Sequence, residues 1–575
     1  MLEYCNPLNL NYKYQHYGKH AHREGADPTL VYFKGKYYLF VSMSAGFYHS
    51  DDLMNWQWHE NRSLDMYNYA PDVRQNGEYL YFCASSGGTA SNIWRTKDPL
   101  SDNFEKVSFP FPFGDPDLFF DDDGRGYLYW GCSNIEPLWG IELDPETMMP
   151  VGERVALFDQ NQDVHGWERL HFANIEPENR GFPMNTTTAV LNPKGRPYIE
   201  GAYMNKWNGK YYLQYAAPGT EYHMYGDGYY VGDSPLGPFT FMPNTPFSLK
   251  PGGFITGAGH GSTIEDQYGN LWHAATMRIS VNETFERRVG LFPAKLDRDG
   301  LLYCNQNFAD YPITVPEGKF DIDELEPQHM LLSYKKSVTA SSSLKGHAPE
   351  LTVDESIRTW WCAKGCKNEW IKIDLGDTYT PHSIQLNFAD ESVPVMKIAR
   401  ELDSDMDTNM RYVDSGRDLH TRYTLDGSLD GENWFSIRDL YSTATDLPHP
   451  YFVLDAGTRL RYVRLTGIEM PYGGRLAVSG IRVFGTGHGS KCDPVSNSTA
   501  HMEDVMTCRL TWNRVVGAQG YNVRFGIAPD KLYNSWLVYD NTEVLISTLN
   551  MGQQYYYSID AFNENGITKG SINPM

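Results

Sequence analysis

The sequence predicts an all-β protein: a five-bladed β-propeller followed by two smaller β-sandwiches. Three observations lead to this prediction. The chain has 575 residues, 14% of them are aromatic, and one hairpin pattern recurs five times in its first half. A single hydrophobic core stops growing at about 250–300 residues, so several domains are expected. Aromatic side chains favour strands over helices.

The recurring hairpin defines the propeller. Its five copies read DPTLVYFKGKYYLFVS, APDVRQNGEYLYFCAS, DPDLFFDDDGRGYLYWG, IEGAYMNKWNGKYYLQYA and GSTIEDQYGNLWHAAT. Each pairs an alternating apolar strand with an aromatic strand across a turn that ends in glycine, which supplies the positive φ of tight hairpins. The turn glycines are Gly35, Gly77, Gly124, Gly209 and Gly269. The first two spacings, 42 and 47 residues, match the length of about 40–50 residues for one blade.

The charge and hydropathy of the chain exclude two classes of partner. A net charge of −23 argues against nucleic acid and against anionic membrane surfaces, because both reward a basic face. No apolar run approaches the roughly 20 residues of a membrane helix, so no membrane insertion is expected. The first residues lack the charged-then-apolar order of a secretory signal. Two locations therefore remain possible: the cytoplasm, or secretion with a signal that is absent from this sequence.

Five aspartates between Asp115 and Asp123 pose the question of their purpose. The three in DDDG, Asp121 to Asp123, fall in a hairpin turn and are expected to be solvated, without the spacing of a calcium loop. Asp115 instead occupies the position of Asp27 in its own repeat, and Glu200 takes the comparable place in the fourth. The lead-in to an innermost strand faces the propeller axis, so three carboxylates are predicted to converge. The alternative is that Asp before Pro only starts a turn.

Together these motifs resemble glycoside hydrolase family 43, over residues 1 to about 315. APDV and GAGHGS also look like that family's second and fifth blades. The resemblance implies an inverting glycosidase in which Asp27 is the general base and Glu200 the general acid. Asp115 would then orient Glu200 and raise its pKa. This chemistry is reasonable in itself, because a like charge keeps one acid protonated while the separate base stays ionised.

The same resemblance suggests further site residues. His260, in GAGHGS, would lie near the axis beside a calcium ion or water, or else be a buried structural histidine. Arg288 would contact a sugar hydroxyl, with Arg287 as the alternative match. No cofactor is required, and Ca²⁺ would be structural.

His16, His20 and His22 are expected to lie in an exposed polar loop, because a carboxylate or cysteine partner for a metal is missing.

The second half of the chain begins after a linker at residues 316–330. Residues 331–487 resemble a discoidin (coagulation factor 5/8 C-type) domain, close to carbohydrate-binding module family 32. At least one of Trp360 and Trp361 is expected in its core. Cys362 and Cys366 are expected to be free thiols or a local disulfide rather than half of a zinc site. Residues 488–575 resemble a fibronectin type III domain, with Trp512 and residues 555–557 on core strands.

The leading functional hypothesis is an exo-acting glycosidase that releases α-L-arabinofuranosyl residues from plant cell-wall polysaccharide or oligosaccharides. A β-xylosidase with the same mechanism is the first alternative. The second is a glycan-binding propeller without catalysis, against which the three retained carboxylates count. A transferase on a related five-bladed fold is a weaker third. The insertion at residues 165–187 is expected to wall one side of the site and favour a closed pocket.

Overall fold

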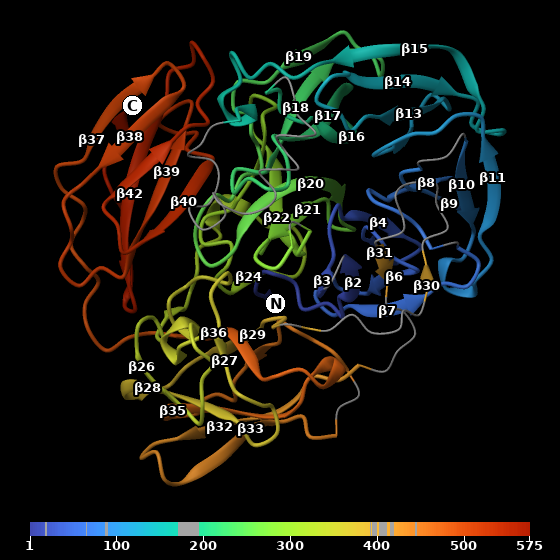
Figure 1. The fold of residues 1–575 in the computed structure, drawn as a ribbon. Coiled ribbons are helices and arrows are strands. Elements are labelled where there is room, and N and C mark those ends of the chain that lie inside the picture. Colours follow the sequence, from blue (N-terminus) through green and yellow to red (C-terminus); the bar gives the residue numbers. More distant parts are fainter. Residues whose placement is uncertain are drawn as a thin grey trace.

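The computed structural model describes residues 1–17, 20–64, 66–86, 90–170, 195–283, 285–391, 393, 400–401, 411–413, 419–442 and 445–575. These residues form sheets joined by loops and a few short 3₁₀ helices, so the predicted all-β class is confirmed (Figure 1). In this described part of the chain, no helix is long and apolar enough to cross a membrane.

The first half contains five four-stranded antiparallel sheets, each built from consecutive strands. In chain order the strands are β4(Thr29–Phe33), β5(Lys36–Phe40), β6(Gly46–Ser50) and β7(Gln57–Glu60); β8(Asp72–Asn76), β9(Tyr79–Cys83), β10(Ser91–Thr96) and β11(Glu105–Phe109); β12(Asp117–Phe120), β13(Gly126–Trp130), β14(Leu138–Leu143) and β15(Pro150–Phe158); β16(Glu200–Trp207), β17(Lys210–Ala217), β18(Gly226–Gly232) and β19(Phe239–Phe241); β20(Thr256–Glu265), β21(Leu271–Arg278), β22(Arg287–Leu296) and β23(Leu302–Cys304). Two 3₁₀ turns, η1(Pro99–Ser101) and η2(Gly166–Glu168), lie in the connections.

The five sheets close into a ring. Each innermost strand contacts the next, from β4 through β8, β12 and β16 to β20, and β20 contacts β4 again. In Figure 1 the sheets follow one another from blue to green around this centre. All five predicted turn glycines have positive φ, between +57° and +87°. The recurring hairpin is therefore the inner half of a propeller blade.

The prediction that DDDG is a solvated turn is wrong for Asp121. Asp122 and Asp123 are exposed, but Asp121 is buried. Its carboxylate accepts hydrogen bonds from Tyr211 Oη at 2.6 Å and from Lys206 Nζ at 2.6 Å. Both partners belong to the fourth blade, so this aspartate joins two neighbouring blades at the end away from the predicted pocket.

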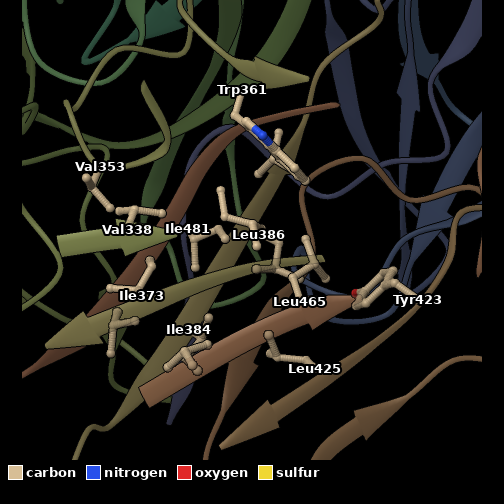
Figure 2. Close-up of a cluster of buried hydrophobic side chains, with 14 of the residues drawn as sticks. Val338, Val353, Trp361, Ile373, Ile384, Leu386, Tyr423, Leu425, Leu465 and Ile481 are labelled. Atoms are coloured by element: carbon tan, nitrogen blue, oxygen red, sulfur yellow. The ribbon is translucent and has the colours of Figure 1, made fainter. Parts of the chain in front are cut away.

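A second region follows the segment that contains η5(Ile322–Glu324). Its two five-stranded sheets consist of β25(Met330–Leu331), β36(Ala477–Gly485), β29(Ser383–Phe388), β34(Tyr451–Val453) and β27(Trp361–Cys362), and of β26(Ser337–Ala340), β28(Trp370–Tyr379), β35(Leu460–Glu469), β32(Arg422–Ser428) and β33(Trp434–Asp439). Turns η6(Pro349–Thr352) and η8(Pro471–Gly473) connect them. Apolar side chains from both sheets meet in one core (Figure 2). Trp361 is fully buried there and Trp360 is half-buried, as expected.

The third region is a smaller sandwich. Its sheets are β37(Thr499–Asp504), β38(Thr507–Thr511) and β41(Glu543–Ile546), against β40(Asn534–Tyr539), β39(Gly520–Gly526), β42(Tyr556–Asn563), β43(Gly566–Thr568) and β44(Asn573–Pro574). Trp512, Tyr555 and Tyr557 are buried in its core. All eight cysteines of the chain, Cys362 and Cys366 included, are free thiols.

The N-terminal residues tie the regions together. β1(Leu2–Tyr4) pairs with β24(Ile313–Val315). The hairpin of β2(Lys13–Tyr17) and β3(His20–Glu24) forms one sheet with β31(Arg411–Val413) and β30(Arg400–Glu401) from the second region. Behind this sheet the buried Arg23 binds Asp390 and, at 2.8 Å, Asp446. Residues more than 360 positions apart thus share one buried ionic contact.

Candidate functional site

The pocket is built by a repeated backbone feature. A left-handed residue recurs in the inner part of every blade: two residues before the inner strand at Asp27 (φ 49°), Ala70 (50°) and Asp115 (49°), and within the inner strand at Gly201 (62°) and His260 (49°). Positive φ is uncommon outside glycine and costs of order 1–3 kcal/mol per residue. At three of these positions the side chains of Asp27, Asp115 and His260 meet.

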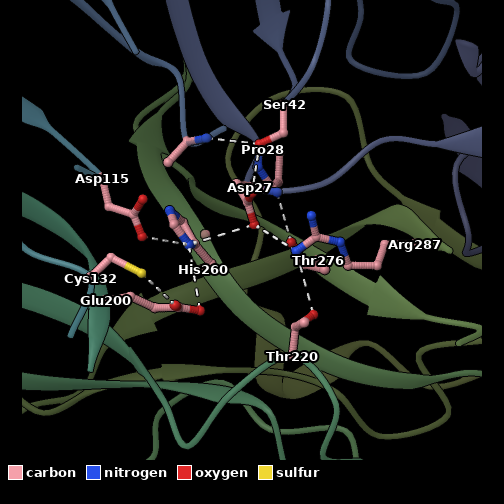
Figure 3. A network of polar contacts seen from close by, with 12 residues as sticks. Asp27, Pro28, Ser42, Asp115, Cys132, Glu200, Thr220, His260, Thr276 and Arg287 are labelled. Carbon is pink, nitrogen blue, oxygen red and sulfur yellow. Dashed lines mark hydrogen bonds and ion pairs between the residues drawn. The ribbon is translucent and has the colours of Figure 1, made fainter. Parts of the chain in front are cut away.

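Asp27 heads the first blade and is buried (Figure 3). Its backbone N–H donates to Thr276 Oγ1 at 2.8 Å, and Ser42 Oγ donates to its Oδ2 at 2.5 Å. Arg287 Nη1 lies 3.3 Å from its Oδ1. Burial favours the neutral acid, but Arg287, His260 and the two hydroxyls outweigh it and lower the pKa of Asp27. Asp27 is therefore held as a carboxylate.

Asp115 heads the third blade in the same backbone conformation. Ser85 Oγ accepts its backbone N–H at 2.8 Å and donates to its Oδ1 at 3.1 Å. Burial raises the pKa of Asp115 to about 7; the nearby carboxylates of Glu200 and Asp27 add to this, while His260 opposes it. Asp115 thus retains a proton close to neutral pH.

Glu200 begins the inner strand of the fourth blade, where a β-bulge separates it from Tyr203. It stands one residue before the left-handed Gly201, whereas Asp27 and Asp115 are themselves left-handed. Tyr225 Oη donates to Glu200 Oε1 at 2.6 Å and Cys132 Sγ to Oε2 at 3.2 Å. Both carboxylate oxygens are therefore positioned by neighbouring side chains.

His260 lies between the three carboxylates, as Figure 3 shows. Its Nδ1 is 3.5 Å from Asp27 Oδ1, 3.8 Å from Asp115 Oδ2 and 4.0 Å from Glu200 Oε1. Burial alone would lower the pKa of His260, but these carboxylates raise it. The buried Asp227 fixes the His260 turn by accepting the backbone N–H groups of His260 and Gly261, at 2.7 and 2.9 Å.

The two candidate arginines point to different places. Arg287 contacts Asp27 and binds Glu24 through Nε at 3.1 Å. Arg288, next along β22, donates from Nε to His449 Nε2 at 2.8 Å and lies 3.7 Å from Asp390, both in the second region. Successive side chains of a strand leave on opposite faces, so only one of the pair can reach the pocket. The structure brings Arg287, and not Arg288, to the carboxylates.

Other residues were missed by the sequence prediction. Ser42, Ser85 and Cys132 each stand two residues after the second strand of their blade, a register visible in the aligned repeats. Tyr225 and Glu24 lie outside the repeats and gave no signal. The expected loop at residues 16–22 is instead the β2–β3 hairpin, with His22 buried. Most of the insertion at residues 165–187 lies outside the described residues.

Comparisons with known proteins agree with this geometry. Residues 22–302 match the family model described as glycosyl hydrolases family 43. A beta-D-galactofuranosidase of Aspergillus niger is 25% identical over 301 residues, which cover 45% of this chain and 75% of that protein. An arabinoxylan arabinofuranohydrolase of Paenibacillus polymyxa is 27% identical over 312 residues, 44% of each chain. A xylosidase/arabinosidase 43A of Humicola insolens is 32% identical over 202 residues, 30% of this chain and 56% of its own.

The matched region coincides with the propeller and contains every carboxylate of the pocket. The chain spans only about half the length of the second and third relatives. The family that these matches support, over residues 22–302, is glycosyl hydrolases family 43.

Proposed function

We propose that the chain is an inverting, exo-acting glycosidase that works by general acid and base catalysis. The observation that carries the proposal is the meeting of Asp27, Asp115 and Glu200, from three different blades, around His260. Two carboxyl groups with opposite protonation states are the requirement for glycoside hydrolysis by inversion. No cofactor takes part in this chemistry. A structural calcium ion near His260 remains a prediction.

In the proposed mechanism Asp27 is the general base. Its lowered pKa leaves it ionised, so it can accept a proton from the attacking water. Glu200 is the general acid that protonates the leaving oxygen. Asp115, whose pKa burial raises to about 7, lies near the same nitrogen of His260 as Glu200 and is proposed to orient the acid. Arg287 is the proposed partner for a sugar hydroxyl beside Asp27.

The positions of acid and base are compatible with inversion. Asp27 Oδ1 and Glu200 Oε1 lie 3.5 and 4.0 Å from the same nitrogen of His260, which sets an upper limit of about 7.5 Å on their separation. This limit admits both the roughly 6.5–9.5 Å of inverting glycosidases and the roughly 5–5.5 Å of retaining ones, so the anomer of the product has to decide between them.

The sugar is proposed from the names of the relatives. Two of them are named for release of a furanosyl sugar, arabinofuranose or galactofuranose, and the third as a xylosidase and arabinosidase. We therefore place α-L-arabinofuranosyl residues of plant cell-wall glycans first. A β-xylosidase activity with the same residues is the second candidate, favoured by the third relative.

The two C-terminal sandwiches are proposed to be a discoidin-like and a fibronectin type III-like module. Two facing five-stranded sheets support the first assignment. A three-stranded sheet of β37, β38 and β41 against a sheet centred on β39 and β42 supports the second, since that pairing is typical of immunoglobulin-like sandwiches.

The test is hydrolysis of nitrophenyl glycosides and arabinoxylan oligosaccharides, with the anomer of the first product followed by NMR. Wild type should release one pentose with inverted configuration. Glu200→Gln should lose most activity on oligosaccharides. It should lose less on nitrophenyl glycosides, because the nitrophenolate leaves without being protonated. Asp27→Asn should lose activity on all of them, because no base remains to activate the water.

Retention of configuration would rule out the inverting mechanism. An inert wild type that still binds arabinoxylan would favour a glycan-binding propeller instead. Glu221→Gln serves as the control for both variants, because Glu221 follows the loop residue Thr220 and is not one of the three carboxylates around His260.

A further inference from the structure

We propose that Asp115, Cys132 and Glu200 form an inhibitory site for a thiophilic divalent cation such as Zn²⁺ or Cd²⁺ inside the catalytic pocket. One ligand atom of each side chain lies within 4.8 Å of the others. Binding is argued from this geometry alone. Inhibition rests on the proposed function, because it requires Glu200 to be the acid.

The cluster is accessible from one side and supported on the other. Asp115 is buried and held by Ser85, Glu200 is half-buried, and Cys132 is exposed. Figure 3 shows the thiol directed at Glu200, and Cys132 Sγ lies 3.2 Å from Glu200 Oε2. An ion arriving from solvent therefore reaches the exposed sulfur first and then the carboxylate oxygens of Glu200 and Asp115.

The position of Cys132 in the repeat explains why only this blade offers such a site. Ser42 and Ser85 stand at the same register, two residues beyond β5 and β9, and each accepts the backbone N–H at the head of the next blade, at 2.8 Å. In the third blade the hydroxyl is replaced by a thiol. Thiolate sulfur selects soft metals, whereas a serine hydroxyl at the same place would not.

The chemistry of binding is a proton exchange. In the free protein the Cys132 thiol carries its proton and donates it in the hydrogen bond to Glu200 Oε2. A cation displaces this proton to water and forms the metal–sulfur bond, while the two carboxylates donate oxygen lone pairs. Ligand atoms of a tetrahedral zinc site lie about 3.5 Å apart. Cys132 and Glu200 already meet this spacing at 3.2 Å, so only the contacts to Asp115, which lie within 4.8 Å, have to shorten.

His260 is placed to complete the coordination sphere. Its Nδ1 lies 3.8 Å from Asp115 and 4.0 Å from Glu200. A bound ion occupies the carboxylate of Glu200 and the space in front of it. Substrate and metal should then exclude each other, and inhibition should be competitive.

The experiment titrates the full-length protein with Cd²⁺ and follows the ultraviolet charge-transfer absorption of cadmium thiolate. Inhibition by Cd²⁺ and Zn²⁺ is measured in parallel, each variant relative to its own metal-free rate. Cys132→Ser restores the hydroxyl of the other blades, and Cys366→Ser removes a half-buried thiol of the second region as the matched control. Mg²⁺, which prefers oxygen ligands, should not inhibit.

We expect one cadmium thiolate per wild-type chain, lost in Cys132→Ser and kept in Cys366→Ser. The inhibition constant should rise by about tenfold or more in Cys132→Ser, since even outer-shell changes cost 10–100-fold in metal affinity. An absorption band or inhibition unchanged by Cys132→Ser overturns the site. A band at Cys132 in a protein that hydrolyses no glycoside upholds the site and refutes the proposed function.

Discussion

Asp27 and Asp115 share a residue type, a backbone conformation and a place in the repeat, yet their pKa values shift in opposite directions. The difference comes from their neighbours. Asp27 has the guanidinium of Arg287 at 3.3 Å, whereas Asp115 faces Glu200 and a serine hydroxyl. The single cation Arg287 therefore accounts for the difference: it lowers the pKa of Asp27, while Asp115, without such a partner, keeps a raised pKa.

This separation predicts a bell-shaped pH profile of kcat/KM. The acid limb should lie below the usual range of an aspartate, because Arg287 and the other partners of Asp27 lower its pKa from the ordinary 3.8. The alkaline limb should fall near pH 7, where the pocket loses the proton on Asp115. Steady-state rates from pH 3 to 9 on a nitrophenyl glycoside test both limbs. A profile flat through pH 8 would contradict the assignment of the proton to Asp115.

Asp115 should also destabilise the folded state at neutral pH. Its folded pKa of about 7 exceeds the ordinary 3.8, so the unfolded chain releases this proton first as the pH rises. The penalty therefore develops between about pH 4 and 7 and is complete above pH 7. Asp115→Asn should raise the melting temperature at pH 8, but not at pH 4, while activity falls. Thermal melts of both proteins at the two pH values decide the point.

Arg287 and Arg288 offer a matched pair of substitutions. Arg287→Met removes the cation beside Asp27, so the acid limb of the pH profile should move upward and kcat/KM should fall about 100-fold. Arg288→Met removes contacts to His449 and Asp390 and should lower stability without moving that limb. Equal shifts of the acid limb in both variants would show that Arg287 has no special role.

The residues that the repeat contains were predictable, and those that act between repeats were not. Asp27 and Asp115 stand at one register of the repeat and Glu200 at the comparable entry to the fourth blade, so the sequence predicted that the three would converge. Tyr225 reaches Glu200 from a loop before β18, with no pattern to mark it. The choice between Arg287 and Arg288 depended on which face of β22 is directed at the axis. Because both residues are arginines, the sequence does not distinguish the two faces at this point.

At the scale of elements, the head of β16 departs from the other blades. Glu200 precedes the left-handed residue instead of being it, and Gly201 packs beneath the ring of His260. A β-carbon at Gly201 would lie 2.7 Å from His260 Cδ2. The glycine is required both for its φ of 62° and for this close approach.

Gly201→Ala should therefore displace His260 and abolish most activity. Gly209→Ala is the control, since it has a φ of 75° in the turn of the same hairpin but no atom near its absent β-carbon. Both variants place an alanine in the left-handed conformation, which should lower the free energy of unfolding by a similar amount, of order 1–2 kcal/mol. Comparable melting temperatures with activity lost only in Gly201→Ala are expected from thermal melts and rate measurements. Equal activity losses would refute the role of Gly201 under His260.

The predicted blades were correct because turn glycines and alternating apolar residues are local signals. The β2–β3 hairpin was taken for a loop because the other two strands of its sheet, β30 and β31, come from residues 400–401 and 411–413. A local sequence pattern cannot predict a strand that pairs from so far along the chain. Asp121 was misjudged for a related reason, since its burial depends on Tyr211 and Lys206 of the next blade.

On the scale of the whole molecule, the second region and the propeller share buried charges. Arg23 binds Asp390 and Asp446, and Arg482 binds Glu355 and the backbone of Asp310. Arg23 is next to Glu24 in sequence, and Arg288 is next to Arg287, the residue that contacts Asp27. The sandwich therefore supports the blade that carries Asp27. The second region is therefore part of the scaffold of the pocket.

Asp446→Asn should destabilise the protein by about 3 kcal/mol or more, because it leaves a buried guanidinium short of a counter-charge. The control is Asp530→Asn, whose pair with Arg298 also joins two regions but is exposed on both sides, so a change within about 1 kcal/mol is expected. Denaturant unfolding with activity as a second readout tests this. Similar losses in the two variants would mean that the Arg23 contact is dispensable.

The pairing of β2 with β31 has a consequence for synthesis. The ribosome releases residues 13–24 first, but their sheet partners at residues 411–413 emerge only after the whole propeller has been translated. At a synthesis rate of roughly 5–20 residues per second, the β2–β3 hairpin waits some 20–80 seconds for β31. The nascent propeller can close its ring during that interval, yet the edge of β2 stays open to other chains until the second region arrives.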